Sequence, residues 1–174
     1  MKITKLALAL FCVASFAVGD PGNGGSKHLS ADLNGYQENP SLSTTAKGSF
    51  VAKIDPSGTM MDYTLSFDGL EGDVLQAHIH TAARGVNGGI MIWLCGTATN
   101  PGPPGTPVCP VSGTVGGTAT AASVIGPSAQ GINVGEFAKA LAAIRAGVAY
   151  ANVHSTKWPG GEIRGQINDS NGKQ

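Results

Sequence analysis

Two histidines stand one residue apart in the segment LQAHIHTAARGVNGGIMIWLC, residues 75–95, and these are the side chains best suited to chemistry. His78 and His80 are two of only four histidines in the 174-residue chain. Side chains at i and i+2 of a β-strand point to the same face. Neutral imidazole is a good ligand for copper, zinc or nickel. The pair therefore indicates either a metal site or a polar sheet face on which the rings bind carboxylates and backbone carbonyls.

A third histidine, His154, lies on a second segment with the same alternation of small and polar residues. In 148–154 the small side chains of Ala149, Ala151 and Val153 alternate with polar ones, and 162–168 behaves in the same way. The seven residues STKWPGG between these segments favour a hairpin. If the strand over 74–81 joins the same sheet, the histidines converge into a three-ligand site that leaves one coordination position open.

We therefore predict a set of metal ligands and a set of further binding residues on one polar face. The predicted metal ligands are His78, His80 and His154, with copper as the first choice of ion. The further binding residues are Tyr150, Asn152, Glu162 and Arg164.

Catalytic residues are not predicted. Ser155 follows His154 but lacks the glycines of a nucleophile elbow. A carboxylate near histidines is compatible with acid–base work, yet no motif supplies a nucleophile. We expect a protein that binds, not an enzyme.

Short alternating runs predict the strands that must position these side chains. They cover 28–33, 48–54, 60–67, 74–81, 89–95, 115–125, 148–154 and 162–168. The turn Asp55-Pro56-Ser57-Gly58 favours a hairpin between the second and third runs. One helix is predicted over 134–146, ending at Gly147. Such a pattern is typical of an all-β antiparallel sandwich or barrel with one short helix.

The N-terminus has the features of a secretory signal peptide over residues 1–19. A short basic head with Lys2 and Lys5 precedes an apolar run of about a dozen residues, too short to span a bilayer comfortably. Residues 20–27 form a glycine-rich lead that predicts a flexible tether. We thus expect an exported protein, periplasmic or secreted, with no transmembrane anchor in its mature chain.

Two cysteines, Cys95 and Cys109, remain after removal of the signal peptide. An oxidising compartment favours a disulfide between them, and two free thiols are the alternative. The bridge would close a loop of roughly 15 residues and stabilise the fold by on the order of 3 kcal/mol.

Charge and composition exclude some partners. Without Lys2 and Lys5, nine basic residues stand against eleven acidic ones, so a basic patch for nucleic acid is not expected. A protein or a component of the cell envelope is the expected partner. The sequon Asn168-Asp169-Ser170 matters only if the source glycosylates its exported proteins.

Two stretches together resemble the CHRD (chordin) domain family. AHIHTAARGVNGGIMIWL is followed by FAKALAAIRAGVAYANVHSTKWPGGEIRGQI, in which a helix leads into an AG-x-x-Y-x-N-x-H strand and then P-x-GEIRGQI. The leading LSADLNGYQENP is similar to the family's opening strand. The resemblance covers about residues 28–168, and we expect residues 28–170 to form one domain of the single-domain, exported microbial type. The loop with Cys95 and Cys109 departs from the family pattern.

The resemblance implies an immunoglobulin-like antiparallel β-sandwich or barrel and a binding or structural module, because chordin binds secreted growth factors. The pair of histidines on a strand also distantly resembles copper-zinc superoxide dismutase. This chain has no zinc loop, so a full dismutase site cannot be assembled, whereas a mononuclear copper site can. Three functions remain: a non-catalytic exported module, a copper-binding protein, and a redox enzyme built on that copper, whose activity we do not expect.

Overall fold

The computed structural model describes residues 27–169, and most of them lie in or between β-strands. The predicted signal peptide over 1–19 lies outside the described residues, as does the predicted lead over 20–27 apart from Lys27. The strands are β1 (His28–Asn34), β2 (Lys47–Ile54), β3 (Met61–Asp68), β4 (Val74–Thr81), β5 (Gly89–Gly96), β6 (Gly113–Ala119), β7 (Ala149–Ser155), β8 (Ile163–Gln166) and β9 (Asn168–Asp169). One α-helix, α1, covers Phe137–Arg145.

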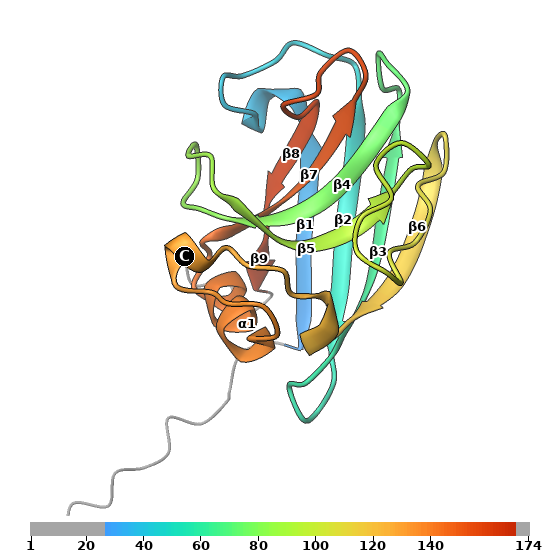
Figure 1. Cartoon of the computed structure of the whole chain (residues 1–174). Helices are drawn as coiled ribbons and strands as arrows, with labels where there is room; N and C mark the ends of the chain where they lie inside the picture. Colours follow the sequence, from blue (N-terminus) through green and yellow to red (C-terminus); the bar gives the residue numbers. More distant parts are fainter. Residues whose placement is uncertain (1–26, 170–174) are drawn as a thin grey trace, which may run out of the picture.

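The strands form one antiparallel sheet that curls into a shape close to a barrel (Figure 1). Their order is β5-β4-β7-β8-β1-β2-β3-β6, and β9 pairs with β1. The all-β antiparallel prediction with one helix is confirmed. The immunoglobulin-like arrangement implied by the family resemblance stays a prediction, because the structure shows one curled sheet.

Alternating side chains fill the inside of the curled sheet. In β3 the side chains of Met61, Tyr63, Leu65 and Phe67 are buried while the residues between them are more exposed. The helix α1 packs against β4, β7 and β9 and covers one end (Figure 1). It buries Phe137, Ala140, Leu141 and Ile144, which follow the helical spacing of an amphipathic element.

The predicted strand over 115–125 begins and ends later in the sequence than the observed strand β6. β6 ends at Ala119, and a short 3-10 helix covers Ala121–Ser123. The Ser123 hydroxyl accepts a hydrogen bond from the Thr120 backbone N–H at 3.1 Å. This local bond competes with strand pairing, so Val124 retains only an isolated bridge to Ile92.

Cys95 and Cys109 form the predicted disulfide. It ties the Pro-Gly loop over residues 97–112 to β5. Among residues 27–169, no helix is both long and apolar enough to cross a membrane.

Candidate metal centre

The three predicted ligands come from two neighbouring strands, β4 and β7. In their antiparallel pairing Gln76 lies opposite His154, and His78 lies opposite Asn152. His78 and His80 therefore share one face of the sheet with His154, opposite to the face of Ala77 and Ile79. On the other side of β4, two irregularities in the pairing with β5 bring Trp93 opposite His78.

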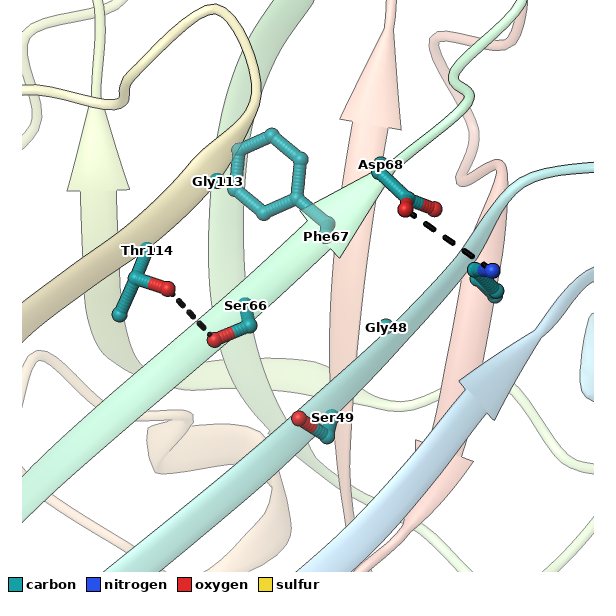
Figure 2. Close-up of a pocket in the computed structure, with 8 residues that line it drawn as sticks. Gly48, Ser49, Ser66, Phe67, Asp68, Gly113 and Thr114 are labelled. Carbon is teal, nitrogen blue, oxygen red and sulfur yellow. Dashed lines mark hydrogen bonds and ion pairs between the residues drawn. The ribbon is translucent and has the colours of Figure 1, made fainter.

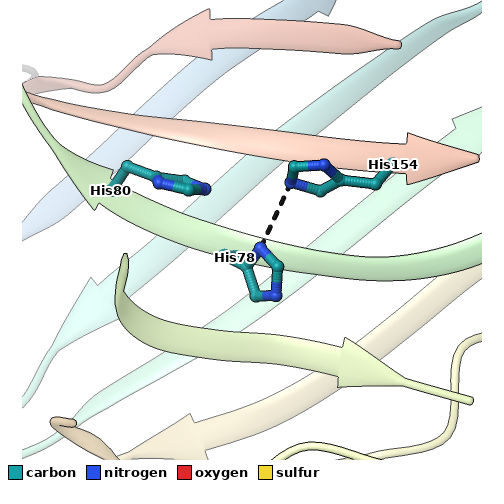
Figure 3. A group of neighbouring side chains, drawn as sticks. All are labelled: His78, His80 and His154. Atoms are coloured by element: carbon teal, nitrogen blue, oxygen red, sulfur yellow. Dashed lines mark hydrogen bonds between the residues drawn. The ribbon is translucent and has the colours of Figure 1, made fainter. Parts of the chain in front are cut away.

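The rings of His78, His80 and His154 form one group (Figure 3). Each ring offers one nitrogen, and these three atoms all lie within 4.8 Å of one another. Two nitrogens that bind one ion at about 2.1 Å each lie at most about 4.2 Å apart. A small inward movement of the rings would therefore allow all three to hold a single ion.

Two backbone carbonyls fix the orientation of two of the rings. His80 Nδ1 lies 3.0 Å from the Gly88 carbonyl oxygen, and His154 Nδ1 lies 3.0 Å from that of Pro159. A carbonyl only accepts hydrogen bonds, so each Nδ1 carries the proton. Each Nε2 then presents its lone pair, which is the state that a metal ligand needs.

Gly88 must be a glycine to hold His80 in this way. A Cβ at this position would lie 1.8 Å from the Thr81 carbonyl oxygen. The Gly88 backbone N–H also donates to the Tyr150 hydroxyl at 3.3 Å. The sequence ARGVNGG thus supplies a close backbone approach that a larger residue would prevent.

His78 faces His154 rather than a carbonyl. His78 Nδ1 lies 3.2 Å from His154 Nε2. Because His154 Nε2 has no proton, His78 Nδ1 is the donor in the metal-free protein. An ion bound at His78 Nδ1 would take the place of this proton, which would move to Nε2 of the same ring and keep the imidazole neutral.

Burial keeps the cluster neutral. The three side chains are between 0% and 8% exposed. Burial, followed by the neighbouring imidazoles, lowers the pKa of His78 to about 2. Burial also lowers the pKa of His80 to about 4 and lowers that of His154. Neutral imidazoles are ready to bind a cation without first losing a proton to solvent.

Two ring nitrogens lack a hydrogen-bond partner among the described residues. They are the buried Nε2 atoms of His78 and His80. A buried polar atom without a partner is uncommon in folded proteins and needs an explanation. For His80 the atom is the lone-pair nitrogen that points into the cluster, so a bound ion would satisfy it.

Tyr150 and Arg164, two of the predicted binding residues, form a stack beside the cluster. The Tyr150 ring lies parallel to that of His80, with centroids 4.8 Å apart and an angle of 2°. The Arg164 guanidinium lies 3.4 Å from the Tyr150 centroid. Since β7 lies between β4 and β8, the tyrosine separates the histidine from the arginine.

The other two predicted binding residues have different surroundings. Asn152 donates through Nδ2 to Glu38 Oε1 at 2.6 Å and to the Ile163 carbonyl at 2.9 Å. Glu162 is fully buried, and its Oε1 accepts from the Thr44 hydroxyl and the Glu71 backbone N–H. Within the described chain, Glu162 makes no hydrogen bond to the histidines.

The sequence interpretation missed two residues of this region. Glu38 follows a 3-10 turn over Gly35–Gln37 and is 8% exposed, and only the polar run YQENP marks it in the sequence. Trp93 has its ring 4.4 Å from that of His78, at an angle of 78°. The irregular pairing of β5 brings it there, and simple alternation does not reveal such a bulge.

A separate cavity of about 350 Å³ lies over β2, β3 and β6 (Figure 2). Four of its polar side chains pair with one another: Ser66 bonds to Thr114 at 2.8 Å, and Lys47 lies 3.9 Å from Asp68. It contains no histidine or cysteine, and none of its lining residues comes from β4 or β7, the strands that carry the three histidines. The histidine cluster remains the better candidate for chemistry.

Comparison with known proteins gives one match. The family model for the CHRD domain matches residues 29–167. No curated protein and no solved structure matches the chain. Because the matched region covers most of the sequence, the chain belongs to the CHRD domain family.

Proposed function

We propose that this CHRD domain is a non-catalytic binding module whose ligand is one transition-metal ion, held by His78, His80 and His154. The observation that carries the proposal is the fixed tautomer of two rings. Gly88 and Pro159 accept hydrogen bonds from the Nδ1–H groups of His80 and His154, so that both Nε2 atoms carry lone pairs, and that of His154 lies 3.2 Å from His78 Nδ1.

Copper is the preferred ion. The ligand set consists of imidazoles alone, and imidazole sites bind divalent copper more strongly than the other first-row divalent metals. Three protein ligands leave a coordination position for water or for a group of a partner molecule. Zinc is the ion that competes best for the same ligands.

The absence of catalysis belongs to the proposal. The Nδ1–H groups of His80 and His154 donate to carbonyls, and burial lowers the pKa of both rings, which makes them poor proton carriers near neutrality. We expect the copper-loaded protein not to remove superoxide.

Export is likewise proposed. The basic head and short apolar run of residues 1–19 support it, and so does the disulfide between Cys95 and Cys109. The protein would then bind its ion in the periplasm or outside the cell, with a protein or envelope component as partner.

The test is a copper titration of the metal-free protein and of its H78A/H80A variant. Wild type should bind one equivalent and should show quenching of Trp93 fluorescence, because Trp93 contacts His78. Loss of outer hydrogen bonds alone weakens metal sites by about 10–100-fold, so loss of two ligands should cost at least about 100-fold.

The fourth histidine provides the matched control. His28 lies at the start of β1 and is exposed, so H28A should bind copper like the wild type. Circular dichroism should show that H78A/H80A keeps its fold. Unchanged copper uptake by the folded double variant would reject the metal site and leave the imidazoles a structural role.

A further inference from the structure

A second cavity is lined in part by Arg164, which stacks on Tyr150 as His80 does. Its volume is about 310 Å³, at the lower end of the range of ligand pockets. It is lined by residues 36–39, Ser41, Arg84 and Gly85 of two loops, together with two residues of β8. Asn87 joins the two loops, because its Nδ2 donates to the Asn39 carbonyl while its Oδ1 accepts from Arg164.

Arg164 brings a buried positive charge to this cavity. The residue is 1% exposed, and it donates to three neutral oxygens, those of Asn87, Val86 and Ala83. Within the described residues no carboxylate lies within ion-pair distance of it. A guanidinium has five N–H donors, so donors remain for a ligand.

Arg84 adds a second positive charge at the rim of the same cavity. It is exposed, and its Nη1 donates to Gln37 Oε1 at 3.4 Å, a long hydrogen bond. Burial is the main cause that lowers the pKa of Arg164; the charges of Tyr150 and Glu38 oppose it, and the like charge of Arg84 lowers the pKa by the smallest amount. Two arginines that repel each other across a cavity favour an anion between them.

Glu38 is the carboxyl group that lines this cavity. Asn152 holds one of its oxygens, and burial raises the pKa of Glu38 to about 7. Near neutral pH the group is therefore ionised only in part, and the two arginines leave the cavity with a net positive charge.

We propose that this cavity binds a small anion with a carboxylate or phosphate group, held by Arg84 and by the free N–H donors of Arg164. Neither arginine is a proposed ligand of the ion, and the inference does not rest on the copper site. Planar guanidinium groups recognise both kinds of oxyanion, so acetate and inorganic phosphate are suitable probes.

The experiment is an NMR titration of the metal-free protein with each probe at constant ionic strength. Amide shifts should saturate and should concentrate in residues 36–41, 83–87 and 164–166. R84Q should weaken binding about tenfold, because it removes one charge-assisted interaction. E38Q should instead tighten binding at pH 8, because it removes the repelling carboxylate.

A matched control separates site binding from net charge. K53Q removes one positive charge from β2, where Lys53 is exposed, and it should bind both probes like the wild type. Saturation with acetate alone assigns a carboxylate ligand, and saturation with phosphate alone assigns a phosphate ligand. Absence of saturation with both probes overturns the proposal, as does equal weakening by K53Q and R84Q or weaker binding in E38Q.

Discussion

At the scale of single residues, backbone carbonyls decide what the imidazoles can do. The Gly88 and Pro159 carbonyls each accept a hydrogen bond from one Nδ1–H, and this leaves the opposite nitrogens of His80 and His154 as acceptors. Without these two contacts either nitrogen of each ring could carry the proton, and the group would be a polar cluster with no preferred ligand. The metal proposal therefore depends on two loops as much as on three histidines.

Glu38 gives a prediction for stability against pH. Burial raises its pKa from 4.5 to about 7 in the folded protein, while the Asn152 hydrogen bond and the Arg164 charge oppose the shift. Between pH 4.5 and about 7, the folded state therefore binds more protons than the unfolded state. The free energy of unfolding should therefore fall as the pH rises from about 4.5 to 7, by about 3 kcal/mol at most.

The measurement compares wild type with E38Q by urea unfolding at pH 5 and pH 8. Glutamine does not titrate, so from pH 5 to pH 8 the free energy of unfolding of E38Q should rise relative to that of wild type by up to about 3 kcal/mol. Contributions from other titrating groups cancel in the comparison. Parallel pH dependence of the two proteins would show that Glu38 titrates as it does in the unfolded chain.

The sequence predicted some of these residues and not others. The spacing of His78 and His80 reveals a shared face because alternation along a strand is a local property. Glu38 reaches Asn152 across 114 positions of the sequence, and no local pattern reports such a contact. The placement of Glu162 could not be predicted either, because its carboxylate bonds to residues of two distant loops.

At the scale of the elements, the pairing of β4 with β7 determines whether the histidine site exists. The hairpin of β7 and β8 follows from a short connection, whereas the pairing of β4 with β7 joins segments about 75 residues apart (Figure 1). Periodicity gives the polar face of each strand but not its neighbour. The assumption that the histidine strand joins the hairpin agrees with the observed sheet order.

The contact between β8 and β1 yields a prediction at Gly165. A Cβ at this position would lie 2.5 Å from the Asp32 carbonyl oxygen and 2.9 Å from its carbon. Because these are backbone atoms of a neighbouring strand, they cannot move aside cheaply. G165A should lower the free energy of unfolding by about 1–3 kcal/mol, the usual cost of overpacking.

Gly160, in the turn of the same hairpin, provides the control. No described atom lies within 4 Å of a Cβ placed there, so G160A should unfold at nearly the same urea concentration as wild type. Equal midpoints for G165A and G160A would show that β8 can move away from β1 and that the strand contact is loose.

At the scale of the whole molecule, the sheet curls until its two edge strands approach each other. β5 and β6 are the ends of the strand order, yet they are in contact. The segment that follows β6 also joins β5, through the bridge between Val124 and Ile92. The disulfide loop covers the same side, since a Cβ at Gly102 would lie 2.6 Å from the Trp93 ring. The contact between β5 and β6, which closes the sheet, therefore lies next to the face that carries His78.

Reduction of the disulfide tests how much the contact between β5 and β6 depends on the cross-link. Cys95 and Cys109 are 14 positions apart, and loop entropy for about 15 residues predicts a loss of about 3 kcal/mol in the free energy of unfolding. Urea unfolding of the wild type with and without reductant measures this loss, and C95A/C109A should not respond to reductant. A loss below about 1 kcal/mol would mean that backbone bonds, such as that from Cys109 N–H to the Gly96 carbonyl, keep the loop ordered without the cross-link.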